Sequence, residues 1–299
     1  MSDRFNQWAQ AIQLDIEKAL SHYLPEEAGS PGQLGLLNQA MRYAVLNGGK
    51  RIRPLLVFAA GRLFDAPDTV LMPVACAVEM VHAYSLVHDD MPCMDNDVLR
   101  RGKPTVHVQF GEAMALLAGD ALQAQAFAVL ANAGGDASRN VARTRILAEA
   151  AGPAGMCGGQ AIDLASIGTT LSYDELEQMD RLKTGAILKA AVLLGALSGR
   201  QSPDNRALEA LEAYARALGL AYQVVDDILD VTEDTERLGK TAGKDARDDK
   251  PTYVSLLGLQ ESRQLAETLC RQAHDALGPF SAEAQRLHDI ADLVVYRKK

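Results

Sequence analysis

The chain has 299 residues, which exceeds the roughly 100–200 residues of a typical domain but still allows one large helical domain. Hydrophobic residues make up 48% of the chain and charged residues 23%, which excludes the disordered and fibrous classes. The net charge of −9 argues against binding to nucleic acid or to anionic lipid, although small basic clusters can still bind a small anion.

Apolar residues recur at three- and four-residue spacing along most of the chain, which predicts helices and few strands. The strongest segments, in chain order, are 37–46, 73–89, 113–131, 207–231 and 281–296. Prolines fall in the polar or Gly-containing joints, namely Pro25, Pro31, Pro104, Pro153, Pro203, Pro251 and Pro279. Pro54 and Pro73 are tolerable if they lie in first turns. Without repeats or linkers, the pattern predicts one all-α domain over residues 1–299, with ten or more helices.

The N-terminal residues 1–20 mix acids with apolar residues and lack a basic start and a cleavage site, so we expect no targeting peptide. A polar or ionisable residue, such as Asp120 or Lys189, interrupts each long apolar run, so we expect no span of the roughly 20 residues that cross a bilayer. The cysteines lie far apart with no CxxC pair, so their spacing indicates neither a zinc site nor a disulfide framework. We therefore expect a cytoplasmic protein with free thiols.

Two acidic clusters each end a strongly apolar helix, where the helix dipole disfavours negative charge. They are Asp89, Asp90 and Asp95 after segment 73–89, and Asp226, Asp227 and Asp230 at the end of segment 207–231. On a helix Asp226 and Asp230 are about 40° apart around the axis, so both can reach a single ion. Carboxylates about 5 Å apart repel by roughly 3 kcal/mol at an effective dielectric near 20. A divalent cation relieves this repulsion, and all-oxygen ligands favour Mg²⁺, Mn²⁺ or Ca²⁺.

Two ordinary explanations of these acids compete with a metal site. A lone acidic pair at a helix end is usually solvated, but two clusters on apolar helices, each followed by basic residues, favour a functional site. A calcium-binding EF-hand loop starting at Asp95 is excluded, because Arg100 stands where that loop needs glycine and Val106 where it needs glutamate.

Basic residues also gather near glycine pairs and behind both acidic clusters. They are Lys50, Arg51 and Arg53 after Gly48 and Gly49; Arg100, Arg101 and Lys103; Lys183, beside Thr184; and Lys240, Lys244 and Lys250. Each is an ordinary surface charge by itself, but together they indicate anion recognition, because Arg and Lys both bind phosphate oxygens. The chain has no Walker A sequence and no GxGxxG after a strand, so nucleotide folds are not favoured. Acids for Mg²⁺ beside bases for phosphate predict a diphosphate site.

These residues stand in motifs that occur in a fixed order nearly from end to end, namely GGKRIRP, VHAYSLVHDDMPCMDNDVLRRGKPTVH, AGDAL, GMCGGQAIDL, KTGA, GLAYQVVDDILD and GKTAGKDARDDKPTYVSLLGL. The chain resembles the trans-prenyl diphosphate synthase family, and its bacterial farnesyl-forming members in particular. The resemblance implies the all-α class I isoprenoid synthase fold with a central apolar cavity. It also implies a homodimer that binds small-molecule diphosphates and three Mg²⁺ ions, with neither nucleic acid nor membrane insertion.

The resemblance assigns roles to individual positions. Mg²⁺ would be held by Asp89, Asp90, Asp95, Asp226, Asp227 and Asp230. The allylic diphosphate would contact Arg100, Lys183, Thr184, Gln223, Lys240 and Lys250, of which Lys183, Thr184, Gln223 and Lys240 count as catalytic. The second substrate, isopentenyl diphosphate, would be held without metal by Lys50, Arg53, His82 and Arg101. Helical spacing agrees for Gln223 and His82, which share a face with the nearest aspartates.

The implied chemistry is ionisation of the allylic diphosphate, attack by the double bond of isopentenyl diphosphate and loss of a proton, for which the released diphosphate is a plausible base. An apolar cavity must exclude water, and the basic tail Arg297, Lys298 and Lys299 could help to close it. Product length is expected to depend on Tyr84 and Ser85, five and four residues before Asp89. A bulky Tyr with a small Ser favours farnesyl. Three alternatives remain: a geranylgeranyl synthase, a class I terpene cyclase and a non-catalytic partner.

Overall fold

The computed structural model describes residues 2–26, 32–233 and 250–297, and the structural statements below concern these residues. They form fourteen α-helices, one π-helical segment, one 3-10 segment and a small antiparallel hairpin, so the predicted all-α fold is confirmed. In chain order the elements are α1 (Asp3–Tyr23), α2 (Gly32–Val45), α3 (Ile52–Arg62), α4 (Asp68–Asp89), β1 (Leu99–Arg100), β2 (Lys103–Pro104), α5 (Val106–Phe110), α6 (Glu112–Ala131), α7 (Ala137–Ala151), α8 (Met156–Ala165), α9 (Tyr173–Asp180), η1 (Arg181–Gly185), α10 (Ala186–Ala196), α11 (Asn205–Thr232), α14 (Tyr253–Leu257), α15 (Leu259–Ala276), η2 (Gly278–Ala284) and α16 (Gln285–Val295).

Side-chain caps fix where several helices begin. At the start of α9, the Ser172 side chain accepts from the backbone N–H of Glu175, whose own carboxylate accepts from the backbone N–H of Ser172. Asp136 and Asp204 accept backbone N–H groups in the first turns of α7 and α11 in the same way. These contacts satisfy N–H groups that have no partner within their helix. The local sequence therefore determines the residue at which each of these helices begins.

Prolines mark helix ends less uniformly than expected. Pro54 lies in the first turn of α3, as predicted, but Pro73 lies further along, inside α4. Pro73 therefore does not lie in a first turn, contrary to the expectation. It is buried within a helix that is apolar on all sides. Pro92 lies just after the end of α4, which ends at Asp89 with Asp90 as its C-cap.

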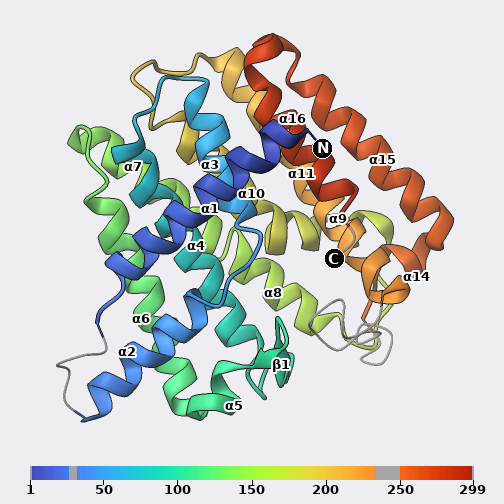
Figure 1. The fold of residues 1–299 in the computed structure, drawn as a ribbon. Coiled ribbons are helices and arrows are strands. Elements are labelled where there is room, and N and C mark those ends of the chain that lie inside the picture. Colours follow the sequence, from blue (N-terminus) through green and yellow to red (C-terminus); the bar gives the residue numbers. More distant parts are fainter. Residues whose placement is uncertain (1, 27–31, 234–249, 298–299) are drawn as a thin grey trace.

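The core is built around α4 and α10, which run through the middle of the molecule (Figure 1). The first packs against α1, α2, α3, α6 and α10, and the second against α3, α7 and α11. Nearly every residue of α10 is buried, which explains its lack of a polar face. The close contact between α3 and α10 depends on Gly195, because a Cβ there would lie 2.3 Å from the carbonyl oxygen of Val57.

Two of the described helices, α4 and α6, are long and apolar enough to cross a bilayer by length and composition, contrary to the expectation of no such span. A single acid such as Glu79 in α4 does not lower the mean hydropathy enough to exclude it. In α4, 78% of the apolar window is buried inside the fold, as is typical of a core helix, whereas the figure for α6 is 39%. The apolar surface of α4 is thus covered by its neighbours, and α6 keeps an exposed apolar face.

Candidate active site

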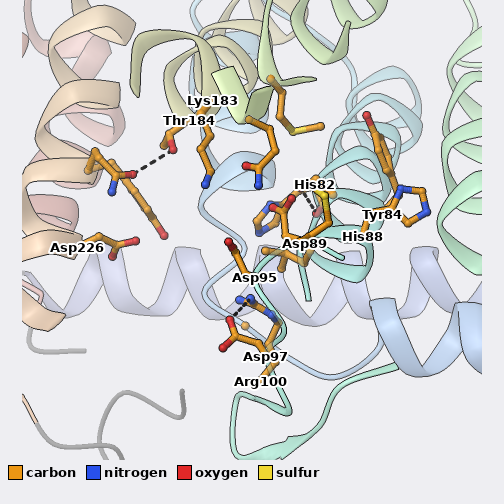
Figure 2. A pocket seen from close by; sticks show the side chains of 18 of the residues that line it. His82, Tyr84, His88, Asp89, Asp95, Asp97, Arg100, Lys183, Thr184 and Asp226 are labelled. Carbon is orange, nitrogen blue, oxygen red and sulfur yellow. Dashed lines mark hydrogen bonds and ion pairs between the residues drawn. The ribbon is translucent and has the colours of Figure 1, made fainter. Parts of the chain in front are cut away.

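A cavity of about 1060 Å³ brings both acidic clusters together. Its walls come from α3, α4, α8, η1 and α11. Asp89 and Asp95 line it on one side, and Asp226 and Asp230 line it from α11. Figure 2 shows the Lys183 side chain pointing into the space between Asp226 and the pair Asp89 and Asp95. The ends of two helices that are far apart in the sequence therefore share one site.

The three aspartates of α11 have different surroundings. Asp226 and Asp230 both line the cavity, as their helical spacing predicted. Asp227 is not among the cavity-lining residues, and its carboxylate accepts from Gln223 Nε2 at 2.9 Å and from the backbone N–H of Tyr253 at 2.8 Å. Asp227 therefore holds Gln223 in position and fixes the start of α14.

The first acidic cluster divides in a similar way. After α4 the chain folds back, and the backbone N–H of Asp95 donates to the carbonyl of Asp89 at 2.9 Å, which places both carboxylates at the cavity. Asp90 is buried and lies outside the cavity lining; it accepts from Arg100 Nε at 2.9 Å and from Nη2 at 2.6 Å. The structure thus places the predicted metal ligand Asp90 against Arg100, and the predicted phosphate ligand Arg100 lines the cavity with one side committed to Asp90.

Burial dominates the electrostatics of these acids. Desolvation raises the pKa of Asp89 to about 6; Lys183 opposes this rise and the neighbouring Asp95 adds to it. Desolvation also raises the pKa of Asp90, and the hydrogen bonds and charge of Arg100 offset part of the increase. The carboxylate of Asp89 is therefore costly to charge unless a cation is present.

Asp163 on α8 is a site residue that sequence reasoning missed. Its Oδ2 accepts from Lys183 Nζ at 2.6 Å and from Lys250 Nζ at 3.3 Å, and Lys250 also donates to Asp95 Oδ1 at 2.8 Å. Burial lowers the pKa of Lys183, but Asp163 and Asp89 outweigh it, so the net shift is upward and the ammonium stays charged. The motif GMCGGQAIDL contains Asp163, yet nothing in its spacing indicated this contact.

Lys183 and Thr184 occupy the π-helical segment η1, whose wider turn lies between α9 and α10. Thr184 Oγ1 donates to Gln223 Oε1 at 3.2 Å, and Gln223 in turn donates to Asp227. Glycines allow the neighbouring helices to approach: a Cβ at Gly159 would lie 2.2 Å from the backbone nitrogen of Lys183. The structure therefore joins the predicted residues Lys183, Thr184 and Gln223 at one end of the cavity.

The remaining predicted basic residues also line the cavity, namely Lys50, Arg53, His82 and Arg101. Arg53 is buried, and its Nε has no hydrogen-bond partner among the described residues. Desolvation lowers the pKa of His82 well below its usual value, and the charges of Arg53 and Arg101 lower it further, so the imidazole is neutral. This side of the cavity therefore contains two arginine cations and the neutral imidazole of His82 beside Lys50.

The position of Arg101 explains why glycine occurs at both 48 and 49. Its guanidinium donates to the carbonyl oxygen of Gly48, and a Cβ at Gly49 would lie 2.8 Å from the same guanidinium. Gly49 also has a φ of 131°, which favours glycine. Arg51 plays another part, because it forms ion pairs with Glu79 at 2.6 Å and Glu17 at 2.5 Å and stabilises the start of α3.

Tyr84 and Ser85, both on α4, line the cavity. The ring of Tyr84 lies edge-on against His88 at a centroid distance of 5.9 Å, and its hydroxyl is 3.8 Å from Cys157 Sγ. Gly119 of α6 makes room for His88, because a Cβ there would lie 2.0 Å from the imidazole. The Tyr84 ring is thus wedged between α4, α6 and α8, where it can limit the depth of the cavity.

The chain end reaches the site through Arg297. Its guanidinium lies 2.5 Å from Asp226 Oδ1, donates to the carbonyl of Tyr222 at 2.9 Å and stacks over the Tyr222 ring. Part of the predicted closing tail therefore contacts the acidic wall directly. The predicted ligand Lys240, together with Lys244, Lys298 and Lys299, lies outside the described residues.

The cavity acids fit Mg²⁺. Both carboxylate oxygens of Asp230 are buried at the cavity wall and have no hydrogen-bond partner among the described residues. Such a carboxylate is costly unless a cation compensates it, and an all-oxygen donor set suits Mg²⁺. With the lysines around Asp163, the site combines acids for a hard dication with bases for phosphate. Fold and site together define a helical enzyme that binds a diphosphate ester.

Comparison with known proteins agrees. The polyprenyl synthetase family profile matches residues 35–282, and the chain belongs to this family. It is 50% identical to a probable farnesyl diphosphate synthase of Bradyrhizobium diazoefficiens over 94% of this chain and 84% of that protein. It is 47% identical to the farnesyl diphosphate synthase of Escherichia coli over 99% of both chains. The resemblance seen in the sequence motifs is therefore confirmed.

Solved structures share the fold over the whole chain. An FPP/GFPP synthase from Zymomonas mobilis superposes with a TM-score of 0.87 at 40% identity, covering 99% of this chain and 100% of the other. A geranyltransferase from Helicobacter pylori, complexed with magnesium and isoprenyl diphosphate, superposes with a TM-score of 0.86 at 33% identity, covering 99% and 97%. The predicted prenyl synthase fold is thus confirmed.

Proposed function

We propose that this protein is an Mg²⁺-dependent prenyltransferase that condenses isopentenyl diphosphate head to tail with dimethylallyl and then geranyl diphosphate, giving farnesyl diphosphate. The observation that carries the proposal is the meeting of two acidic walls, Asp89 with Asp95 and Asp226 with Asp230, across one cavity that also contains Lys183. Family membership and relatives named farnesyl diphosphate synthase support the same reaction.

The allylic diphosphate is proposed to lie between the acidic walls. Asp89, Asp95, Asp226 and Asp230 would hold Mg²⁺, three ions in all, and the metal would supply the positive charge that stabilises diphosphate as a leaving group. The chain's own cations add to this charge at one end, where Lys183 and Lys250 share Asp163. Ionisation of the allylic C–O bond then gives a delocalised carbocation, and no side-chain nucleophile is needed.

Isopentenyl diphosphate is proposed to bind without metal at Lys50, Arg53, His82 and Arg101. The unpartnered Nε of Arg53 is a donor that an anion could satisfy, and the guanidinium geometry suits phosphate oxygens. Neutral His82 can donate one N–H without adding charge. The two diphosphates would thus be recognised differently, one through metal and one through side chains.

The hydrocarbon end of the cavity must keep water from the carbocation. Its lining there is apolar or aromatic and includes Tyr84, Met156, Ala161 and Leu164. Asp163, on the same helix as Met156, Ala161 and Leu164, is engaged by two lysines. Released diphosphate is therefore the base that we propose for the final proton.

The product assay tests this function. Purified protein is incubated with Mg²⁺, isopentenyl diphosphate and dimethylallyl diphosphate, and the dephosphorylated alcohols are sized by chromatography. The proposal expects farnesol as the main product. Geranylgeraniol would instead indicate the longer-chain synthase, cyclic hydrocarbons a terpene cyclase, and no product a non-catalytic partner.

A homodimer in the cytoplasm is proposed as the working form. The exposed apolar face of α6 includes Leu116 and Leu117, which are 48% and 51% exposed. A second copy of the chain would cover this face, and α6 also supports Tyr84 through His88 and Gly119, so pairing would stabilise the cavity floor. Light scattering should give a dimer mass for the protein and a monomer mass for the Leu116→Glu, Leu117→Glu double variant.

A further inference from the structure

A cluster of metal-ligand side chains lies between α15 and α16, and none of its residues lines the active-site cavity. Cys270 and His274 lie one turn apart on α15, and His288 and Asp292 lie one turn apart on α16. The two helices pack against each other at the outer side of the molecule (Figure 1). Helical spacing turns both pairs toward the shared interface.

The donor atoms converge on one point. Cys270 Sγ lies 3.6 Å from Asp292 Oδ1, and His274 Nε2 lies 2.9 Å from the same oxygen. One ligand atom from each of Cys270, His274 and Asp292 lies within 4.8 Å of the other two. Donors around a tetrahedral zinc ion lie roughly 3.3–3.8 Å apart, given the usual bond lengths. The separation of the Cys270 and Asp292 atoms therefore already suits a shared ion, whereas the His274 and Asp292 atoms would have to move slightly apart.

The hydrogen bonds of this cluster converge on Asp292. The Cys270 thiol and His274 Nε2 both face Asp292 Oδ1, so two hydrogens are directed at one carboxylate oxygen. Burial raises the pKa of Cys270 to about 11, and the charge of Asp292 adds to the rise, so the thiol keeps its proton without a cation. A dication would take the place of these hydrogens and restore charge balance.

His288 is placed to orient His274. Its Nδ1 lies 2.6 Å from His274 Nδ1, and the two rings stack at 4.8 Å with an interplanar angle of 13°. In a ligating histidine, the N–H on the second ring nitrogen commonly donates to a neighbouring acceptor, which fixes the ring and its tautomer. Burial lowers the pKa of His288, with His274 adding to the effect, so His288 is neutral and does not repel a cation.

The site is also accessible. Cys270 is buried, whereas the side chains of His274 and Asp292 are 31% and 44% exposed. An ion can therefore enter from solvent, and a water molecule can complete a fourth position. The mixed sulfur, nitrogen and oxygen donors favour zinc-class ions over Mg²⁺, which separates this cluster chemically from the active site.

We propose that Cys270, His274 and Asp292 form a binding site for a divalent ion of the zinc class, with His288 as the residue that positions His274. Binding forms one bond from the metal to the Cys270 sulfur and releases the thiol proton to solvent; both imidazoles stay neutral and only change tautomer. The ion joins α15 to α16 and so stabilises the C-terminal part of the fold. This site is independent of the proposed prenyltransferase activity.

Cobalt titration tests the proposal. The full chain, kept in excess Mg²⁺ to occupy the acidic cavity, is titrated with Co²⁺, and the near-ultraviolet thiolate-to-cobalt band is recorded. One equivalent should produce the band, and Zn²⁺ should displace Co²⁺ and abolish it. The His288→Phe variant keeps all three ligands, so it should retain the band with affinity about 10- to 100-fold weaker.

Matched cysteine variants identify the thiol. Cys270→Ser should lose the band, whereas Cys157→Ser, which changes a thiol at the active-site cavity, should retain it. Circular dichroism confirms that each variant is folded. A titration without a thiolate band would show that the cluster is a hydrogen-bonded network and overturn the proposal, as would a band that persists in Cys270→Ser.

Discussion

Lys183 Nζ lies 2.6 Å from Asp163 Oδ2, and this ion pair joins η1 to α8 at the end of the active-site cavity. Lys250 shares the same oxygen at 3.3 Å, so one carboxylate holds two lysines that come from distant parts of the chain. The proposed diphosphate site therefore depends on an acid that is not itself among the cavity-lining residues.

Asp163→Asn should misplace both lysines and lower kcat/KM for the allylic substrate by about 30-fold, the equivalent of about 2 kcal/mol for one partner of a buried charge pair. The KM for isopentenyl diphosphate should stay unchanged, because the basic residues proposed for it lie elsewhere. Steady-state kinetics, with the concentration of each substrate varied in turn, measure the effect on the two substrates separately. Asp174→Asn, on the exposed side of α9, is the control, and an equal loss for both substrates would point to general damage instead.

Asp90 should contribute to stability more than to metal binding. Asp90→Asn removes the nearer of the two buried carboxylates that pair with Arg100, and breaking such a pair costs about 3 kcal/mol of unfolding free energy. Urea unfolding measures the loss, and titration with Mn²⁺, followed by electron paramagnetic resonance, measures metal affinity. We expect lower stability with metal affinity retained. Unchanged stability with lost metal affinity would make Asp90 a ligand, as the sequence motif first suggested.

Metal affinity should fall as the pH falls. Burial, the largest influence, raises the pKa of Asp89 to about 6, so below that pH the carboxyl holds a proton that a cation must displace. Affinity for Mn²⁺ should therefore decrease from about pH 7 to about pH 5, approaching ten-fold per unit below the pKa. Titration with Mn²⁺ in the absence of diphosphate, followed by electron paramagnetic resonance, measures this affinity at each pH. An affinity that is constant or increases over this range is incompatible with a raised pKa at Asp89.

Tyr84 and Ser85 should set product length. Removing the ring in Tyr84→Ala opens the space between α4, α6 and α8, so geranylgeranyl products should appear. Filling the space in Ser85→Phe should shorten the product to geranyl. Chromatography of the dephosphorylated products measures both, with Tyr23→Ala, a tyrosine outside the cavity, as the control. Identical product lengths in all three variants would remove both residues from this role.

Sequence periodicity was sufficient for the helices and for part of the site. Asp226 and Asp230 were placed on one helical face by spacing alone, and both line the cavity. The different roles of adjacent acids could not be predicted from spacing. Asp89 and Asp90 are equivalent in a motif, but the turn after α4, where Asp97 N–H donates to the Asp90 carbonyl, directs one into the cavity and the other to Arg100.

Contacts between distant segments could not be predicted in this way. Asp163 meets Lys183 through the packing of α8 against η1, and it meets Lys250 across 87 positions of sequence. The cluster at Cys270 was missed for the same reason. The cysteine spacing contains no CxxC pair, because this cluster combines a Cys and a His on one helix with a His and an Asp on the next.

The central claim is that both acidic walls hold metal for one diphosphate. The most direct measurement is the rate of Mg²⁺-dependent product formation by Asp89→Asn and Asp226→Asn, each shown to be folded by circular dichroism. Because each variant removes a charged ligand from one wall, turnover should fall by at least about 100-fold in both. Turnover at the unmodified rate in either variant would contradict the claim.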